Sequence, residues 1–210
     1  MGVTISAALR RVGLFGGAFD PPHVAHVALV NAAVSQLALD ELRVLPTGHA
    51  WHKTRTLSPV EHRLAMANVA FADLERVVLD TRETRRNGPS YTVDTLREIQ
   101  LEQPGAELFL VIGEDQARAL TTWHEWEEIP KLAIICVAAR AYSMRAEDQF
   151  NGQFSAPQAY QSRFCTLQMP LLSVSATDIR SRIASRQGVV PLVGEPVARY
   201  IDQHHLYQTA

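Results

Sequence analysis

The 210-residue chain has only two cysteines, Cys136 and Cys165, and both lie in apolar stretches. It has no Cys-x-x-Cys pair and no zinc-type spacing, so we expect two reduced core thiols. A formal net charge of −2 argues against a broad basic surface and a nucleic-acid partner, but it allows one small anion in a local positive pocket. No apolar run reaches membrane length and residues 1–11 lack a signal-peptide core, so we expect a cytoplasmic protein with no membrane partner.

Short apolar runs alternate with helical patterns along the chain. Strands are predicted at 11–15, 42–45, 76–80, 108–112, 132–138 and 163–168, and helices at 24–37, 59–72, 91–100, 115–120, 177–185 and 196–204. This alternation predicts an α/β fold, a doubly wound, Rossmann-like parallel sheet with helices on both faces. We expect a single domain over residues 1–210, with a long polar loop at 141–162.

A glycine-rich stretch follows the first predicted strand: Gly16-Gly17-Ala18-Phe19-Asp20-Pro21-Pro22-His23-Val24-Ala25-His26. Ligands of doubly wound sheets bind beyond such strand ends, and helix-start N–H groups hold phosphate. We expect Asp20 to cap the next helix, with Pro21 at its first position. His23 and His26 then share one helix face as neutral donors to phosphate oxygens. The alternative is a tight turn with histidines bonded to the backbone.

Two further segments lie at predicted strand ends. Lys53 follows the second strand, in residues 46–53, and could place its charge on a polyphosphate, although a lone loop lysine is often merely solvated. The helix predicted at 91–100 starts with Ser90 as its cap, and the N–H groups near Tyr91 and Thr92 would suit a carboxylate ligand. Taken by itself, the second segment is better explained as a capped helix without a ligand.

The fourth predicted strand ends at Gly113-Glu114-Asp115. Acids at a helix start are favourable without any ligand, but an acid at such a strand exit also commonly holds ribose hydroxyls. Downstream, Trp123 or Trp126 could stack on an aromatic ligand, and we expect at least one of these rings to lie in the core.

Ser175 and Asp178 resemble a capping box for the helix predicted at 177–185. Arg180 and Arg182 lie early in that helix, where the dipole disfavours a cation. A bound anion would resolve this conflict. Alternatively, Arg180 pairs with a carboxylate such as that of Asp178, which would be of little energetic consequence.

Together these segments resemble the bacterial nicotinate-nucleotide adenylyltransferases of the nucleotidylyltransferase superfamily. The superfamily signatures are Gly-Gly-x-Phe-Asp-Pro-x-His-x-x-His at 16–26 and Ser-x-Thr-x-Ile-Arg at 175–180. The narrower assignment rests on residues 90–96, Gly113-Glu114-Asp115 with Trp123, His52-Lys53, and the ending Tyr200-Ile201 … Leu206-Tyr207. The similarity runs from residue 12 to residue 207. Ala25 replaces a family glycine, and residues 46–53 lack the Pro-Pro that usually precedes His-Lys.

The resemblance implies adenylyl transfer from ATP to nicotinate mononucleotide, which gives nicotinate adenine dinucleotide and pyrophosphate in NAD biosynthesis. It implies catalytic roles for His23, His26, Lys53 and Arg180; ATP contacts from Gly16, Gly17, Phe19, Gly113, Asp115, Ser175 and Thr177; and nicotinate mononucleotide contacts from Ser90, Tyr91, Thr92 and Trp123. Residues from about 173 to 207 would complete the ATP site. Mg²⁺ is expected on the ATP phosphates, because no carboxylate cluster offers a cage.

Two rival functions share part of this pattern. Another nucleotidylyltransferase, for example one acting on phosphopantetheine, would have the first and last motifs but not residues 90–96 with Trp123. A nucleotide-binding regulatory protein without activity is suggested only by Ala25. A carboxylate gains more from helix N–H groups than a neutral carboxamide does, so we expect the nicotinate form of the substrate over the nicotinamide form.

Overall fold

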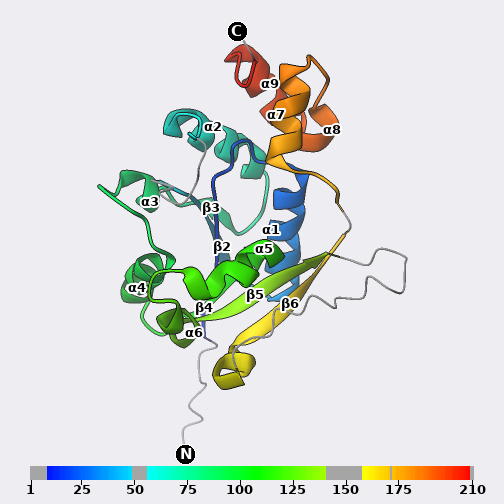
Figure 1. Ribbon diagram of the computed structural model, residues 1–210. Coiled ribbons are helices and arrows are strands. Elements are labelled where there is room, and N and C mark those ends of the chain that lie inside the picture. The colour runs from blue at the N-terminus through cyan, green and yellow to red at the C-terminus, as the bar shows by residue number, and fades with distance from the viewer. Residues whose placement is uncertain (1–8, 49–55, 141–157, 171, 209–210) are drawn as a thin grey trace, which may run out of the picture.

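The computed structural model describes residues 9–48, 56–140, 158–170 and 172–208. Its strands form one parallel sheet in the order β3-β2-β1-β4-β5-β6 (Figure 1). They are β1 (Arg11–Gly17), β2 (Glu41–Pro46), β3 (Val77–Leu79), β4 (Glu107–Gly113), β5 (Ala133–Arg140) and β6 (Phe164–Met169). All six predicted strands and the α/β class are confirmed.

The strand order reverses at β1, which pairs in parallel with β2 on one side and with β4 on the other. Chain connections leave in opposite directions at this point, and ligands of doubly wound sheets bind beyond the carboxyl ends of the strands there. The glycine-rich stretch begins with the last two residues of β1, so the topology places it at the edge where the sequence analysis expects a ligand.

Six of the helices correspond to the predicted ones: α1 (Val24–Gln36), α2 (Val60–Phe71), α4 (Thr92–Glu102), α5 (Glu114–Ala119), α7 (Ala176–Ala184) and α9 (Glu195–Gln203). The short helices α3 (Arg82–Arg85), α6 (Ile129–Leu132) and α8 (Val190–Val193) were not predicted. Neither were the 3₁₀ turns η1 (Leu120–Thr122), η2 (Trp126–Glu128) and η3 (Gln158–Arg163). A single turn is too short to show a helical period.

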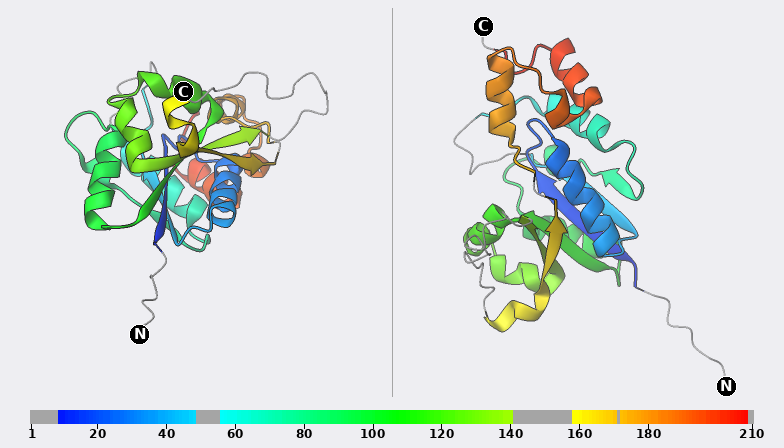
Figure 2. Two further views of the ribbon diagram at one scale, coloured as in Figure 1. Left: turned by 90° about the horizontal axis from the view of Figure 1, so that it is seen from below. Right: turned by 90° about the vertical axis from the view of Figure 1, so that its right-hand side faces the viewer.

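Alternate residues of the central strands enter two different cores, one on each face of the sheet. Leu108, Leu110 and Ile112 of β4 pack with α4, α5 and α6, whereas Phe109 and Val111 pack with α1 and α2. Figure 2 shows helices on both sides of the sheet. Because both faces are covered, β4 is apolar almost without interruption, as the sequence analysis expected.

A third core joins the C-terminal helices to α2 beyond the end of the sheet (Figure 1). Met66 of α2 and Ile179 of α7 are fully buried in it, beside Val197 and Ile201 of α9. These contacts bring α7, with its arginines, toward the glycine-rich stretch.

Both cysteines are free thiols on neighbouring strands, as predicted; Cys136 is buried and Cys165 is half-buried. The predicted loop at 141–162 lies outside the described residues up to residue 157, and η3 forms at its end. No helix in the described part of the chain is long and apolar enough to span a membrane.

Candidate active site

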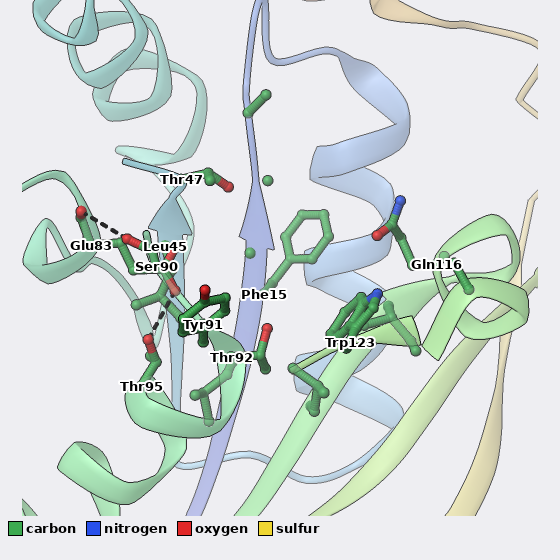
Figure 3. Close-up of a pocket in the computed structure, with 18 of the residues that line it drawn as sticks. Phe15, Leu45, Thr47, Glu83, Ser90, Tyr91, Thr92, Thr95, Gln116 and Trp123 are labelled. Carbon is green, nitrogen blue, oxygen red and sulfur yellow. Dashed lines mark hydrogen bonds between the residues drawn. The ribbon is translucent and has the colours of Figure 1, made fainter. Parts of the chain in front are cut away.

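A pocket of about 500 Å³ opens beyond the ends of β1 and β4 (Figure 3). Its wall contains residues from three of the predicted segments, brought together from positions almost 110 residues apart in the chain: Gly16, Gly17, His26, Ser90, Tyr91, Thr92, Gly113 and Trp123. Eight of the predicted site residues thus border one pocket, together with residues that the sequence did not single out. Ala25, which replaces the family glycine, is not one of the described residues that line it.

The residue that caps α1 is His23, not Asp20, so the predicted cap is wrong. His23 is extended, with φ −150° and ψ 170°, and the helix begins at Val24. The Asp20 carboxylate is occupied elsewhere: Oδ1 accepts a hydrogen bond from the Tyr207 hydroxyl at 2.6 Å, and Oδ2 from the Ser58 backbone N–H at 3.1 Å. Long-range contacts have thus overridden the local capping preference.

The two imidazoles lie against each other, as their spacing predicts. Their ring centroids are 3.7 Å apart, and the His23 backbone N–H donates to Nδ1 of His26 over 3.2 Å. Since Nδ1 accepts this bond, the proton of a neutral His26 ring belongs on Nε2. His26 lines the pocket, so its ring can offer a donor there.

His23 is the more deeply buried of the pair, with 8% of its surface exposed. Burial lowers the pKa of its imidazole to about 4, which agrees with the predicted neutral ring. Its Nδ1 has no hydrogen-bond partner among the described residues. A buried nitrogen in that state is costly unless a ligand or water completes it.

The glycines differ in what surrounds them. A Cβ on Gly113 would meet nothing within 4 Å, and one on Gly16 only the Leu45 carbonyl oxygen at 3.9 Å. Both residues line the pocket, so their bare backbone faces open space that a ligand can enter. Gly17 is different, because a Cβ there would come within 3.0 Å of the Phe19 ring.

Phe19 itself is buried rather than exposed to the pocket. Its ring packs edge-on against His26, with centroids 5.2 Å apart, and against Phe71. Phe19 therefore packs against the His26 ring from the protein interior.

Arg180 reaches the glycine-rich stretch from α7. Its Nη1 donates to the Asp20 carbonyl oxygen over 2.7 Å, and its Nη2 donates to Thr177 Oγ1 over 3.0 Å. Asp178, the carboxylate considered as its partner in the alternative interpretation, pairs with Arg182 at 2.9 Å. The Arg180 guanidinium is thus bonded to Asp20, the residue three positions before His23 in the chain.

The start of α7 confirms half of the predicted capping box. Ser175 caps the helix, and its Oγ accepts a hydrogen bond from the Asp178 N–H at 3.1 Å. Ser175 and Thr177 are exposed beside Arg180. Asp115 is likewise exposed, in the first turn of α5, and is not among the described residues that line the pocket.

The segment before α4 forms the opposite side of the pocket. The predicted Ser90 cap is wrong, because Tyr91 is the cap residue and the Ser90 hydroxyl donates to the Glu83 carbonyl oxygen over 3.2 Å. The Tyr91 ring stacks on His124, with centroids 4.2 Å apart. Trp123 lies across from Tyr91 and Thr92 in Figure 3, so α4's first N–H groups and an aromatic ring border the same space.

One of the rings of Trp123 and Trp126 packs against a core, as expected, although neither is fully buried. Trp123 packs against the core that α4, α5 and α6 share, while one side of it lines the pocket. Trp126 instead contacts Tyr160 edge-on, with centroids 5.9 Å apart. Of these two rings, Trp123 is the one that lines the pocket.

Sequence reasoning gave no role to Glu83, which is 8% exposed and lines the pocket. Its Oε1 accepts a hydrogen bond from Thr95 Oγ1 at 2.9 Å, and burial raises the pKa of the carboxyl group. Its position among polar neighbours in the sequence gives no signal of burial.

A second buried residue, Arg63 of α2, was also missed. Its guanidinium donates to the carbonyl oxygens of Ala18 (3.0 Å), Thr47 (2.9 Å) and Ser58 (3.1 Å). It thus ties the glycine-rich stretch to both sides of the segment that carries Lys53, although residues 49–55 lie outside the described part of the chain. The sequence does contain a sign that Arg63 is buried: it shares an i, i+3, i+4 stripe with the buried residues Met66 and Ala67.

The donor set in the described ranges does not form a cation cage. No group of three or more His, Cys, Asp or Glu side chains there could hold a metal ion. The imidazole and guanidinium groups instead favour an anionic ligand.

Comparison with known proteins identifies the class to which this site belongs. Residues 14–182 match the cytidylyltransferase-like family, so the chain is a member of that class of nucleotidyltransferase fold. Two relatives named as probable nicotinate-nucleotide adenylyltransferases are 63% and 46% identical to it. The Albidiferax ferrireducens protein matches over 96% of this chain and 100% of its own, and the Methylibium petroleiphilum protein over 94% and 92%. The chain belongs to the nicotinate-nucleotide adenylyltransferase family.

A solved structure shares the fold at much lower identity. The Plasmodium falciparum nicotinic acid mononucleotide adenylyltransferase, complexed with APC, superposes with a TM-score of 0.74 and is 16% identical. The match covers 94% of this chain and 97% of that one. A further structure described as the Plasmodium falciparum enzyme, complexed with NaAD, gives a TM-score of 0.72 at 17% identity over the same shares of both chains.

Proposed function

We propose that the protein transfers the adenylyl group of ATP to nicotinate mononucleotide and releases pyrophosphate. The observation that carries this proposal is the composition of one pocket. His26 and the open backbone of Gly16 line it on one side, and Tyr91, Thr92 and Trp123 on the other. The side with the hydrogen-bond donors suits a polyphosphate. The aromatic side, with its helix N-terminus, suits a pyridine ring that carries a carboxylate.

The product is nicotinate adenine dinucleotide, a precursor of NAD. An oxygen of the mononucleotide's phosphate attacks the α-phosphorus of ATP, the new P–O bond forms, and the bond to pyrophosphate breaks. The attacking oxygen is already anionic at neutral pH, so the reaction needs no strong general base. The protein's contribution is to hold two anions in line and to stabilise charge on the phosphate oxygens.

The predicted catalytic residues act together in this proposal. His26 donates from Nε2 to a phosphate oxygen, and neutral His23 supports it. Arg180 and Lys53 neutralise the polyphosphate, with Ser175 and Thr177 at the start of α7. Gly113 and Asp115 hold the ribose of ATP.

The nicotinate carboxylate lies at the N-terminus of α4. This helix has 11 residues, so its first N–H groups carry the positive end of a real helix dipole. Trp123 packs against the pyridine ring. A neutral carboxamide gains less from the same N–H groups, which supports a preference for the nicotinate form.

Magnesium enters as part of the substrate. The described residues offer no carboxylate cage, and the Asp20 carboxylate already accepts two hydrogen bonds. We therefore propose that ATP binds as its Mg²⁺ complex, with the ion on the phosphates and on water.

A pyrophosphate-release assay tests this function. The purified protein receives ATP with nicotinate mononucleotide, nicotinamide mononucleotide or phosphopantetheine in separate reactions. We expect the highest kcat/KM with nicotinate mononucleotide, and equal values for the two mononucleotides would refute the preference. Turnover only with phosphopantetheine would assign the rival transferase function, and no turnover with any acceptor would favour a binding protein.

A further inference from the structure

Tyr207 hydrogen-bonds directly to the glycine-rich stretch. Its hydroxyl donates to Oδ1 of Asp20 over 2.6 Å, between residues 187 positions apart in the sequence. Asp20 is 2% exposed, so its carboxylate depends on protein donors for its hydrogen bonds. This bond is therefore of the strong, charge-assisted kind.

Asp20 is also where two other segments meet. Its Oδ2 accepts from the Ser58 N–H, and its backbone carbonyl oxygen accepts from Arg180 Nη1. Asp20 itself lies between the pocket glycine Gly16 and His23. One buried residue thus joins the glycine-rich stretch, the segment before α2, α7 and the region after α9.

The Tyr207 ring is held firmly enough to direct its hydroxyl. It packs against the third core, whose buried members include Met66 and Ile179, and its oxygen lies 3.8 Å from the Met66 sulfur. Burial, together with the neighbouring Asp20 carboxylate, raises the pKa of Tyr207 above its ordinary value. The hydroxyl therefore stays protonated, and remains a donor, at neutral pH.

We propose that Tyr207 is a positioning residue for ATP: through Asp20 it fixes the glycine-rich stretch and Arg180 relative to each other. The proposal rests on the function proposed above, in which both elements hold the polyphosphate. Without the hydroxyl, Oδ1 of Asp20 loses the hydrogen bond from Tyr207. Asp20, whose carbonyl oxygen is bonded to Arg180, then shifts. Displacements of about 1 Å are costly for an in-line transfer that depends on positioning.

The chain offers a matched control in Tyr200. Its hydroxyl lies 3.0 Å from Nδ1 of His62, so it also joins the C-terminal region to α2. Its hydroxyl differs from that of Tyr207 in bonding to His62 of α2 and not to Asp20. Tyr207→Phe and Tyr200→Phe each remove one buried or half-buried hydroxyl. Only Tyr207→Phe should weaken the binding of ATP.

The experiment measures ATP affinity by titration calorimetry, steady-state kinetics for both substrates, and the denaturation midpoint of each variant. We expect Tyr207→Phe to reduce the ATP affinity and the kcat/KM for ATP by about tenfold, the effect of losing one charge-assisted hydrogen bond. The KM for nicotinate mononucleotide should stay within about twofold of the wild-type value. Tyr200→Phe should match the wild type in all ligand parameters. Equal ATP parameters in the two variants would overturn the proposal.

A double-mutant cycle separates positioning from general destabilisation. Asp20→Asn alone should weaken ATP binding, and adding Tyr207→Phe should weaken it little further, because the two residues act through one bond. Additive losses of ATP affinity would overturn the proposal even if Tyr207→Phe alone folds poorly.

Failure of the proposed function gives a different result. A wild-type protein that binds ATP but does not turn over nicotinate mononucleotide would refute the transferase function, while the affinities of the variants would still test Tyr207. A wild-type protein that binds no ATP would overturn both.

Discussion

The His23 backbone N–H donates to Nδ1 of His26, and the two imidazole rings stack with centroids 3.7 Å apart. Two charged rings at this separation would repel each other strongly in a partly buried site. Burial lowers the pKa of His23 and keeps its ring neutral, and Nδ1 of His26 carries no proton while it accepts the His23 N–H. A neutral pair can donate a hydrogen bond to a phosphate, as proposed above, without carrying positive charge.

The donor role of His26 predicts a specific order among its variants. His26→Ala removes the Nε2 donor and should lower kcat by about 10²–10³, while the KM values change only a few-fold. His26→Gln, which can place an amide N–H near the Nε2 position, should retain more activity than His26→Asn. Steady-state kinetics measure all three, and near-normal turnover of His26→Ala would contradict the role.

The buried His23 predicts a pH dependence of stability. Its pKa is about 4 in the folded protein, below the ordinary value of 6.5, so the unfolded chain binds more protons between these limits. The free energy of unfolding should therefore fall as the pH drops from 6.5 toward 4, by up to about 3 kcal/mol from this group.

Urea denaturation at several pH values, for the wild type and His23→Gln, measures this contribution. The variant should show a shallower loss of stability over the same range, because the remaining histidines are common to both proteins. Identical pH slopes would mean that His23 is not buried as a neutral ring.

Gly113→Ala should separate ligand binding from folding. The added methyl group meets no protein atom within 4 Å and projects where the pocket lies, so the denaturation midpoint should not change. The KM for ATP should rise by about tenfold, because the methyl occupies space that the nucleotide needs. Gly188→Ala, equally free of neighbours within 4 Å but not lining the pocket, is the control. An unchanged KM in Gly113→Ala would show that ATP binds elsewhere.

The two tryptophans form another matched pair. Trp123→Ala should raise the KM for nicotinate mononucleotide by about tenfold, since an aromatic contact contributes about 1 kcal/mol beyond the area that it buries. Trp126→Ala should leave this KM unchanged, because Trp126 packs on Tyr160 and is not among the described residues of the pocket wall. Equal effects of the two substitutions on the KM would argue against stacking on Trp123.

Periodicity was enough to predict the sheet and the longer helices. Apolar runs such as Leu108 to Ile112 identify strands covered on both faces, and the strand exit after β1 identifies the ligand edge. The short helices α3, α6 and α8 left no such pattern. Each has 4 residues, too few for a hydrophobic period.

The helix-cap predictions failed where residues elsewhere in the chain bond to the predicted capping side chain. Asp20 followed by Pro21 has the composition of a helix start, but Tyr207 and Ser58 take its carboxylate. Ser90 likewise bonds to the Glu83 carbonyl oxygen instead of capping α4. No local pattern reveals these partners, because they depend on the completed fold.

A crystal structure with a bound non-hydrolysable ATP analogue would test most directly whether the imidazole pair and Arg180 act on one triphosphate. We predict polyphosphate oxygens within about 3 Å of both His26 Nε2 and the Arg180 guanidinium, with Gly16 N–H facing the phosphates. A polyphosphate bound away from His26 and Arg180 would contradict this arrangement.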